Sequence, residues 1–303
     1  MARALRFDYR SAWFAAGRTT LALATASELL CSRSGALFAP VGDATGPVCT
    51  TQPRSLFCLG DPHQFIDARR WLAILVLVLV ASGYRPRLTS LLHLWIVYSV
   101  TTSLSLPDGG DSIALIVVVL ITPMCLADPR AWQWTPPRRH LARTGRTVSY
   151  LSFWALRLQV AYLYADSAIA KMGVADWQNG SAFYYFVRDK MFGAAGPLGP
   201  LWMWVSDHNL TTLAMTWGTI VIELAIALFT LLNARWRMVA FWLCLTLHGL
   251  IFVIMGLFSF SAVMAGLGAL IATSSVAMSR GKRRPLPRKH PAAQNDSPSS
   301  EHG

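Results

Sequence analysis

The residues best suited to carry chemistry lie in one long apolar segment, residues 149–172. Its polar side chains include Arg157, Gln159, Tyr164, Asp166 and Lys171. Because the segment is long and apolar enough to cross a bilayer, we expect its charged groups to pair with one another or to face a cavity. A lysine acts as a base near neutral pH only when burial favours its neutral form. Lys171 is therefore a candidate base.

Polar residues form two stripes along this segment when it is drawn as a helix. Arg157, Tyr164 and Lys171 are seven residues apart and share one stripe. Gln159 and Asp166 are also seven apart and lie on a nearly opposite stripe. Such a helix cannot show lipid on both faces, so we expect it at the centre of a bundle. The alternative for Lys171 is that it only snorkels to the lipid headgroups from the outer end of the helix.

Residues outside this segment extend the candidate site. The aromatic run 182–187 is too short to span and predicts a short interfacial helix. Glu223 and His248 lie inside later apolar segments, although a lone intramembrane histidine can also be a hydrogen-bonded structural group. We assign candidate catalytic roles to Lys171, His248 and Glu223. Candidate substrate-binding residues are Asp166, Trp177, Tyr164, Arg157 and Tyr184.

The stretch Pro-Asp-Gly-Gly-Asp at residues 107–111 is a turn by composition. Its two carboxylates could line the same mouth as Lys171. The alternative is a solvated turn with no part in the site.

Composition places the chain in a membrane. Hydrophobic residues make up 54% and charged residues only 14%, whereas a soluble domain carries roughly a quarter charged residues. The net charge of +12 would suggest nucleic acid in a soluble protein. Here the basic residues lie mainly between apolar segments, which is the pattern of topology signals. We therefore expect the lipid bilayer as a partner and no nucleic acid.

Eight apolar segments are near the length of about 20 residues that a helix needs to cross the hydrocarbon core. They are residues 11–31, 66–84, 88–106, 111–127, 149–172, 210–233, 236–256 and 258–278. The predicted fold is therefore all-α, a polytopic transmembrane helical bundle of about eight spans, with a short interfacial helix after the fifth.

The distribution of basic residues predicts the orientation. With the N-terminus inside, 18 of the 27 Lys and Arg fall in inner segments, 6 in outer segments and 3 within spans. This bias satisfies the positive-inside rule. We expect a multi-pass protein of the cell membrane with both termini cytoplasmic. Its parts are a cytoplasmic N-terminus (1–10), a transmembrane domain (11–279) and a disordered basic tail (280–303).

Cys49 and Cys58 share one polar loop that this topology places outside. The outer face of a bacterial or secretory membrane permits disulfides, so we expect a bridge between them, with two free thiols as the alternative. No pair of cysteines has the two-residue spacing of a zinc site, so we expect no metal.

Several short motifs together resemble the HTTM domain, the membrane domain shared with vitamin K-dependent gamma-carboxylase. They are Tyr162-Leu163-Tyr164, Ala168-Ile169-Ala170-Lys171, Asp176-Trp177, Gly180, Ala182, Glu223-Leu224, Arg235, His248, Phe252 and the run 255–259. The stretches 82–87, 107–111 and 127–132 are similar to the sporulation-delaying protein B branch of this domain. The resemblance covers roughly residues 10–275.

This resemblance implies a multi-span helical protein with Lys171 at the position of the carboxylase lysine that deprotonates a reduced quinone. It implies a quinone such as menaquinone as a cofactor. The sequence departs from the carboxylase pattern at Ala170, because the carboxylase has two adjacent lysines and uses the second, whereas here a single Lys171 follows an alanine. The B-type branch resembles proteins needed to mature a secreted peptide toxin or bacteriocin.

Two functions from different classes follow. The first is a maturation factor for a secreted peptide toxin, acting at the outer membrane face by quinone-linked base chemistry. The second is a non-catalytic membrane chaperone, or an export or immunity partner, in which the aromatic run and the outer loop grip the peptide. Both imply a secreted peptide precursor as partner, and both leave room for a small soluble or membrane partner protein.

Overall fold

The computed structural model describes residues 7–40, 46–47, 49, 54–62, 64–190, 192–194 and 196–275. The predicted tail, residues 280–303, lies outside the described residues, as does most of the N-terminal segment 1–10. Within the described residues the regular structure is helical, and the β-type pairing is limited to one isolated β-bridge between Tyr84 and Trp132. The all-α prediction is confirmed for this part of the chain.

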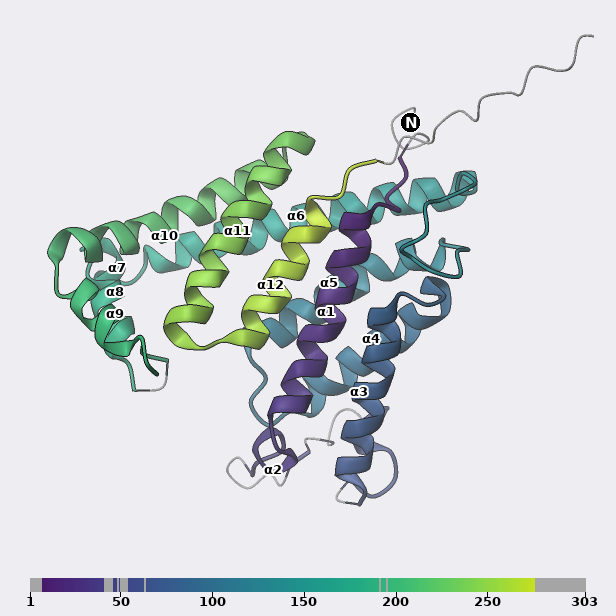
Figure 1. Ribbon diagram of the computed structural model, residues 1–303, viewed down its shortest axis with the longest axis horizontal. Coiled ribbons are helices and arrows are strands. Elements are labelled where there is room, and N and C mark those ends of the chain that lie inside the picture. The colour runs from purple at the N-terminus through teal and green to yellow at the C-terminus, as the bar shows by residue number, and fades with distance from the viewer. Residues whose placement is uncertain are drawn as a thin grey trace, which may run out of the picture.

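Eight helices of 14 or more residues form the body of the described chain (Figure 1). They are α1 (Ala12–Cys31), α3 (Ile66–Ser82), α4 (Pro86–Ser103), α5 (Gly109–Leu126), α6 (Arg143–Lys171), α10 (Asn209–Thr230), α11 (Ala234–Met255) and α12 (Phe258–Ile271). Each overlaps one of the eight predicted apolar segments. Three of them, α5, α10 and α11, are long and apolar enough to cross a membrane. For the other five helices a membrane crossing stays a prediction.

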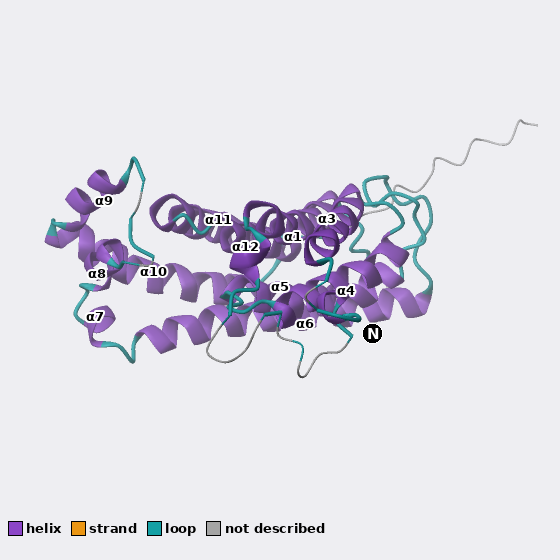
Figure 2. Ribbon diagram, turned by 90° about the horizontal axis from the view of Figure 1, so that it is seen from below, coloured by secondary structure: helices purple, strands orange, loops and turns teal. Residues whose placement is uncertain are grey.

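The eight long helices form a closed ring in which each helix contacts the next. The order is α1, α3, α4, α5, α6, α10, α11 and α12, which returns to α1, and α5 also packs on α12 across the ring. Figure 2 shows α11, α12, α1 and α3 in one layer, with α4, α5 and α6 in another beneath it. The main core lies between these layers and draws on α1, α5, α6, α11 and α12.

The position of α6 differs from the one expected. It is a member of the ring, between α5 and α10, and the side that carries Asp166 is exposed. The expectation of a central helix was wrong because its two neighbours cover the stripe of Arg157 and Tyr164 and leave the opposite stripe open.

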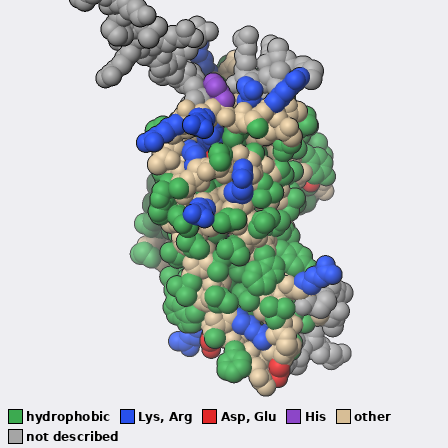
Figure 3. Space-filling view, turned by 90° about the vertical axis from the view of Figure 1, so that its right-hand side faces the viewer, with side chains coloured by type: hydrophobic (Ala, Val, Ile, Leu, Met, Phe, Trp, Pro, Cys, Tyr) green, Lys and Arg blue, Asp and Glu red, His purple; other side chains and the backbone are tan. Residues whose placement is uncertain are grey.

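The outer surface of the ring is suited to lipid. On α3 five large apolar side chains are exposed: Trp71, Leu72, Leu75, Val78 and Leu79. Figure 3 shows hydrophobic side chains over much of one face, with most of its Lys and Arg toward one end. On a soluble protein an exposed apolar surface of this extent would be an interaction site. On a membrane protein it is the surface expected to face lipid.

Two buried arginines bind the C-terminal ends of two helices. The Arg157 guanidinium donates to the carbonyl oxygens of Thr230 and Leu232, both at 2.8 Å. Arg237 donates in the same way to Ile271 and Thr273, again at 2.8 Å. The last carbonyls of a helix have no partner within it, so these arginines close the ends of α10 and α12.

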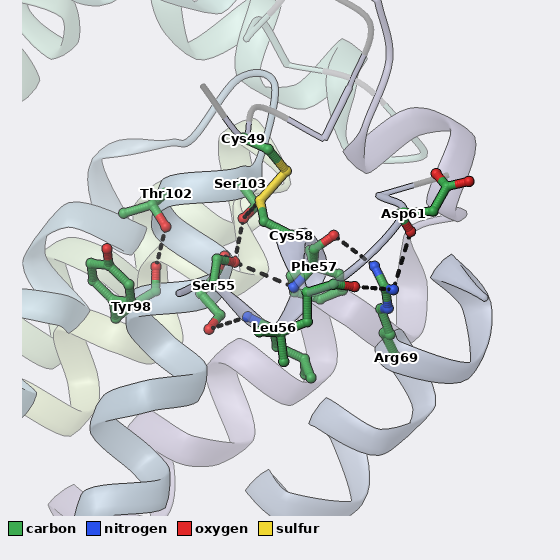
Figure 4. The surroundings of a disulfide bond; sticks show 12 residues. Cys49, Ser55, Leu56, Phe57, Cys58, Asp61, Arg69, Tyr98, Thr102 and Ser103 are labelled. Carbon is green, nitrogen blue, oxygen red and sulfur yellow. Dashed lines mark hydrogen bonds between the residues drawn. A yellow bond between two sulfur atoms is a disulfide. The ribbon is translucent and has the colours of Figure 1, made fainter. Parts of the chain in front are cut away.

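Cys49 and Cys58 are joined by a disulfide in the loop between α1 and α3, with a Cα–Cα distance of 5.5 Å. Figure 4 shows how the loop is tied to its neighbours. Ser55 shares a hydrogen bond of 2.6 Å with Ser103 of α4, and the Arg69 guanidinium of α3 donates to the Phe57 carbonyl at 2.9 Å. The bridge therefore closes a loop that is already bound to two helices.

Candidate active site

The chain turns back on itself after α6 through three short helices, α7 (Ala175–Gln178), α8 (Ala182–Arg188) and α9 (Gly199–Ser206). The Phe183 amide at the start of α8 donates to the Thr216 hydroxyl of α10 at 3.1 Å. Gly180 has a φ of +82°, and a Cβ atom there would lie 2.3 Å from Leu213 Cδ1. Only glycine fits this close turn, which lays α8 along the N-terminal half of α10.

A cavity of about 370 Å³ lies between α6, α8, α10, α11 and α12. Its walls are mainly apolar and include Leu163, Phe186, Met215, Ile251 and Phe260. Polar side chains enter it from α6, α7, α10 and α11: Tyr164, Ser167, Lys171, Trp177, Thr216, Thr219, Glu223 and His248. A mainly apolar cavity with a few convergent polar groups is the usual form of a ligand or active site.

An ion pair between Lys171 and Glu223 is the main polar feature of this cavity. Lys171 Nζ donates to Glu223 Oε1 at 2.8 Å, to Glu223 Oε2 at 2.9 Å and to Ser167 Oγ at 2.6 Å. The Ser167 hydroxyl in turn donates to Glu223 Oε1 at 3.1 Å. All three ammonium protons thus have an acceptor, and the pair adds no net charge to the cavity.

The pair lies well away from the ends of α10. Glu223 is 14 residues from Asn209 and 7 residues from Thr230, which places it about 21 Å and about 10 Å from the two ends of the helix. The indole ring of Trp177 lies 5.3 Å from Lys171 Nζ. The Lys171 ammonium group is therefore held by α10, and snorkelling to the headgroups stays an alternative prediction for this residue.

A second chain of hydrogen bonds joins α6 to α11 beside the ion pair. The Tyr164 hydroxyl lies 3.0 Å from His248 Nε2 and 3.1 Å from the Cys244 thiol. The Cys244 thiol also lies 3.2 Å from the Met264 carbonyl oxygen of α12. His248 is 4% exposed, and its Nδ1 atom has no hydrogen-bond partner in the described part of the chain. That nitrogen is therefore a buried polar atom without a protein partner among the described residues.

Five of the eight predicted site residues line this one cavity: Lys171, Glu223, His248, Tyr164 and Trp177. The other three lie elsewhere. Arg157 binds the end of α10, Asp166 is exposed on the outer side of α6, and Tyr184 stacks under the Arg188 guanidinium at 3.7 Å. The turn at 107–111 caps α5, because Asp108 Oδ1 accepts from the Asp111 amide and Asp111 Oδ2 accepts from the Asp108 amide, both at 2.9 Å.

Two residues that hydrogen-bond to predicted site residues were not themselves predicted. Ser167 is one helical turn before Lys171, and Cys244 is one turn before His248, so each shares a face with a predicted residue. That spacing is the signal that could have identified them. Among the described residues no group of three or more His, Cys, Asp or Glu is arranged to hold a metal ion.

Two curated proteins of Bacillus subtilis (strain 168) are similar to this chain. The uncharacterized protein YitO is 34% identical over 276 residues, which cover 88% of each chain. The sporulation-delaying protein SdpB is 31% identical over 194 residues, which cover 63% of this chain and 60% of SdpB. No protein-family profile and no solved structure matches the chain.

Proposed function

Because the chain belongs to the family of YitO and the sporulation-delaying protein SdpB, we propose that it is an integral membrane maturation factor for a secreted peptide toxin or bacteriocin. The observation that carries this proposal is the similarity to SdpB, which suggests a role in a sporulation-delaying toxin pathway. The cavity between α6 and α10 is the proposed site of action. Its partners are the bilayer, the peptide precursor and, as a further proposal, a small soluble or membrane protein.

The proposed chemistry uses Lys171 as a base. In the proposed step, one proton passes from Nζ to Glu223 across their 2.8 Å contact, which gives the free amine. This transfer leaves an amine and a carboxylic acid and does not change the net charge of the cavity. Nζ then accepts a proton from the substrate group, while Ser167 keeps the amine in place through the 2.6 Å contact.

The residues of the cavity fit the quinone that the HTTM resemblance implies. Apolar walls suit a ring and its alkyl chain, and the unpartnered Nδ1 atom of His248 can bind one polar oxygen. When bound, a reduced quinone such as menaquinol would supply reducing equivalents. Lys171 would hold or remove a proton beside it, and Tyr164 would orient His248 through the 3.0 Å hydrogen bond.

The alternative is a non-catalytic chaperone, or an export or immunity partner, for the same peptide. Phe183 and Phe186 of the aromatic run line the cavity, and Tyr185 beside them is 55% exposed. This arrangement suits a site that grips an apolar peptide segment without changing it. It requires no proton transfer at Lys171.

Intact-mass spectrometry of the secreted peptide separates the two proposals. The measurement uses the cognate peptide precursor, expressed with and without this chain. A mass change or a new covalent modification that depends on the chain supports maturation. A peptide of unchanged mass whose secretion alone depends on the chain supports the chaperone or export role.

A further inference from the structure

Among the described residues, one charged side chain deep inside a long helix makes no hydrogen bond or ion pair. Four charged side chains lie more than four residues from both ends of a described long helix: Arg18, Arg157, Asp166 and Glu223. Arg18 donates to Thr89 and Gln133, Arg157 binds carbonyls and Glu223 pairs with Lys171. Asp166 is exposed and makes no hydrogen bond or ion pair with any described residue.

The depth of Asp166 follows from two contacts on the same helix. Arg157 is bound to the carbonyl end of α10, and Lys171 is bound to Glu223 within α10. Asp166 lies between them, about 14 Å along the helix from Arg157 and about 8 Å from Lys171. It is therefore level with a segment of α10, which is a candidate membrane span.

The surface around Asp166 is a single apolar strip on α6. Leu158, Tyr162 and Ile169 are 57%, 64% and 68% exposed, and with Asp166 they recur every three or four residues on one face. The strip carries one negative charge, and no basic side chain of α6 lies on it. An ionised carboxylate facing lipid at this depth is costly and is expected to pair.

We propose that this strip of α6, Leu158 to Ile169, is the docking surface for a transmembrane helix of another protein that carries a lysine or arginine near its middle. The partner cation pairs with Asp166 at matched depth. A second copy of this chain is a poor occupant, because a two-fold axis along the membrane normal brings each residue of the strip to its own copy. That pairing would set Asp166 against Asp166.

A synthetic transmembrane peptide tests this surface without knowledge of the natural partner. The probe is a tryptophan-flanked leucine–alanine peptide with one central lysine. The control peptide is identical except that leucine replaces this lysine. Binding is measured by energy transfer between donor-labelled full-length chain and acceptor-labelled peptide in phosphatidylcholine vesicles. We expect the wild type to bind the lysine peptide at least 10-fold more tightly than the leucine peptide.

Variants locate the preference. The measured quantity is the ratio of the affinity for the lysine peptide to the affinity for the leucine peptide. Asp166→Leu should reduce this ratio to near one, whereas Asp166→Glu and the control Asp67→Leu on α3 should leave it at the wild-type value. Equal binding of both peptides by the wild type would overturn the proposal, as would a preference that survives in Asp166→Leu. Self-association of the chain that is lost in Asp166→Leu, without a lysine preference, would assign the strip to a second copy instead. If Asp166→Leu does not insert into the membrane, Asp166→Asn replaces it, because it also removes the charge, and its ratio of affinities should likewise fall to near one.

Discussion

Lys171 and Glu223 neutralise each other inside the cavity, so each residue depends on the other for stability. Their side chains are 20% and 8% exposed, which leaves little water to screen an unpaired charge. Removing one partner of a buried pair usually costs about 3–5 kcal/mol, whereas replacing both by uncharged groups is often close to neutral. The pair is therefore a structural element as well as the proposed source of the base.

The first prediction concerns this dependence. Lys171→Met should lower the free energy of unfolding by about 3–5 kcal/mol, because Glu223 loses its partner. Adding Glu223→Gln to that variant should restore most of the loss. Thermal unfolding of the purified chains in detergent measures both. Equal stability of the single and double variants would show that the pair contributes no coupling.

The seven-residue spacing on α6 correctly placed three polar residues on one face of the helix, but it did not show which of them line the cavity. Arg157, Tyr164 and Lys171 do lie on the covered side of α6, as their seven-residue interval indicates. Yet 14 residues separate Arg157 from Lys171, or about 21 Å along the helix, so one cavity cannot include both. Which part of the stripe lines the cavity depends on where α8, α10 and α11 approach it, and the sequence does not show that.

At the scale of helices, hydropathy identified the eight long helices but not all their limits. The predicted span 149–172 corresponds to α6, which begins six residues earlier at Arg143 because a helix can continue as a charged turn beyond its apolar part. After α6 the sequence predicted one short interfacial helix, and the structure has three. Two of them, α8 and α9, are held by contacts with α10, and such contacts leave no periodic signal in the sequence.

Arg157 is predicted to stabilise the join between α6 and α10 without taking part in the chemistry. Arg157→Leu removes both bonds to the carbonyls of Thr230 and Leu232, so the free energy of unfolding should fall by about 3 kcal/mol. Peptide processing per folded molecule should stay at the wild-type level. A variant of normal stability that fails to process the peptide would instead support the substrate-binding role inferred from the sequence.

The disulfide should give a modest stabilisation because it closes a short loop. Cys49 and Cys58 are nine residues apart, for which the chain-entropy treatment gives about 2–3 kcal/mol. Cys49→Ser with Cys58→Ser should therefore lower the unfolding temperature while the chain still inserts. Alkylation of membranes with and without reductant tests the bond itself: full labelling of both thiols without reductant would contradict it.

At the scale of the molecule, the topology of eight spans with both termini inside stays a prediction that rests on the basic residues. Reporter fusions after Arg146 and after Arg235 should both report the cytoplasm, and a fusion after Lys190 should report the outside. The physical reason is the excess of Lys and Arg in the segments predicted to be inside. An external signal from either of the first two fusions would contradict the eight-span arrangement.

The central claim is that the Lys171–Glu223 cavity acts on a secreted peptide by proton transfer, and Lys171→Arg tests it most directly. Arginine keeps the charge and can still pair with Glu223, but it does not release a proton near neutral pH. The measurement is the intact mass of the secreted peptide from cells that carry the wild type, Lys171→Arg or the folding control Arg157→Leu, each at equal membrane level. The account predicts that the peptide keeps its unprocessed mass with Lys171→Arg and reaches its mature mass with the other two. Peptide of mature mass from Lys171→Arg would contradict the assignment of Lys171 as the base.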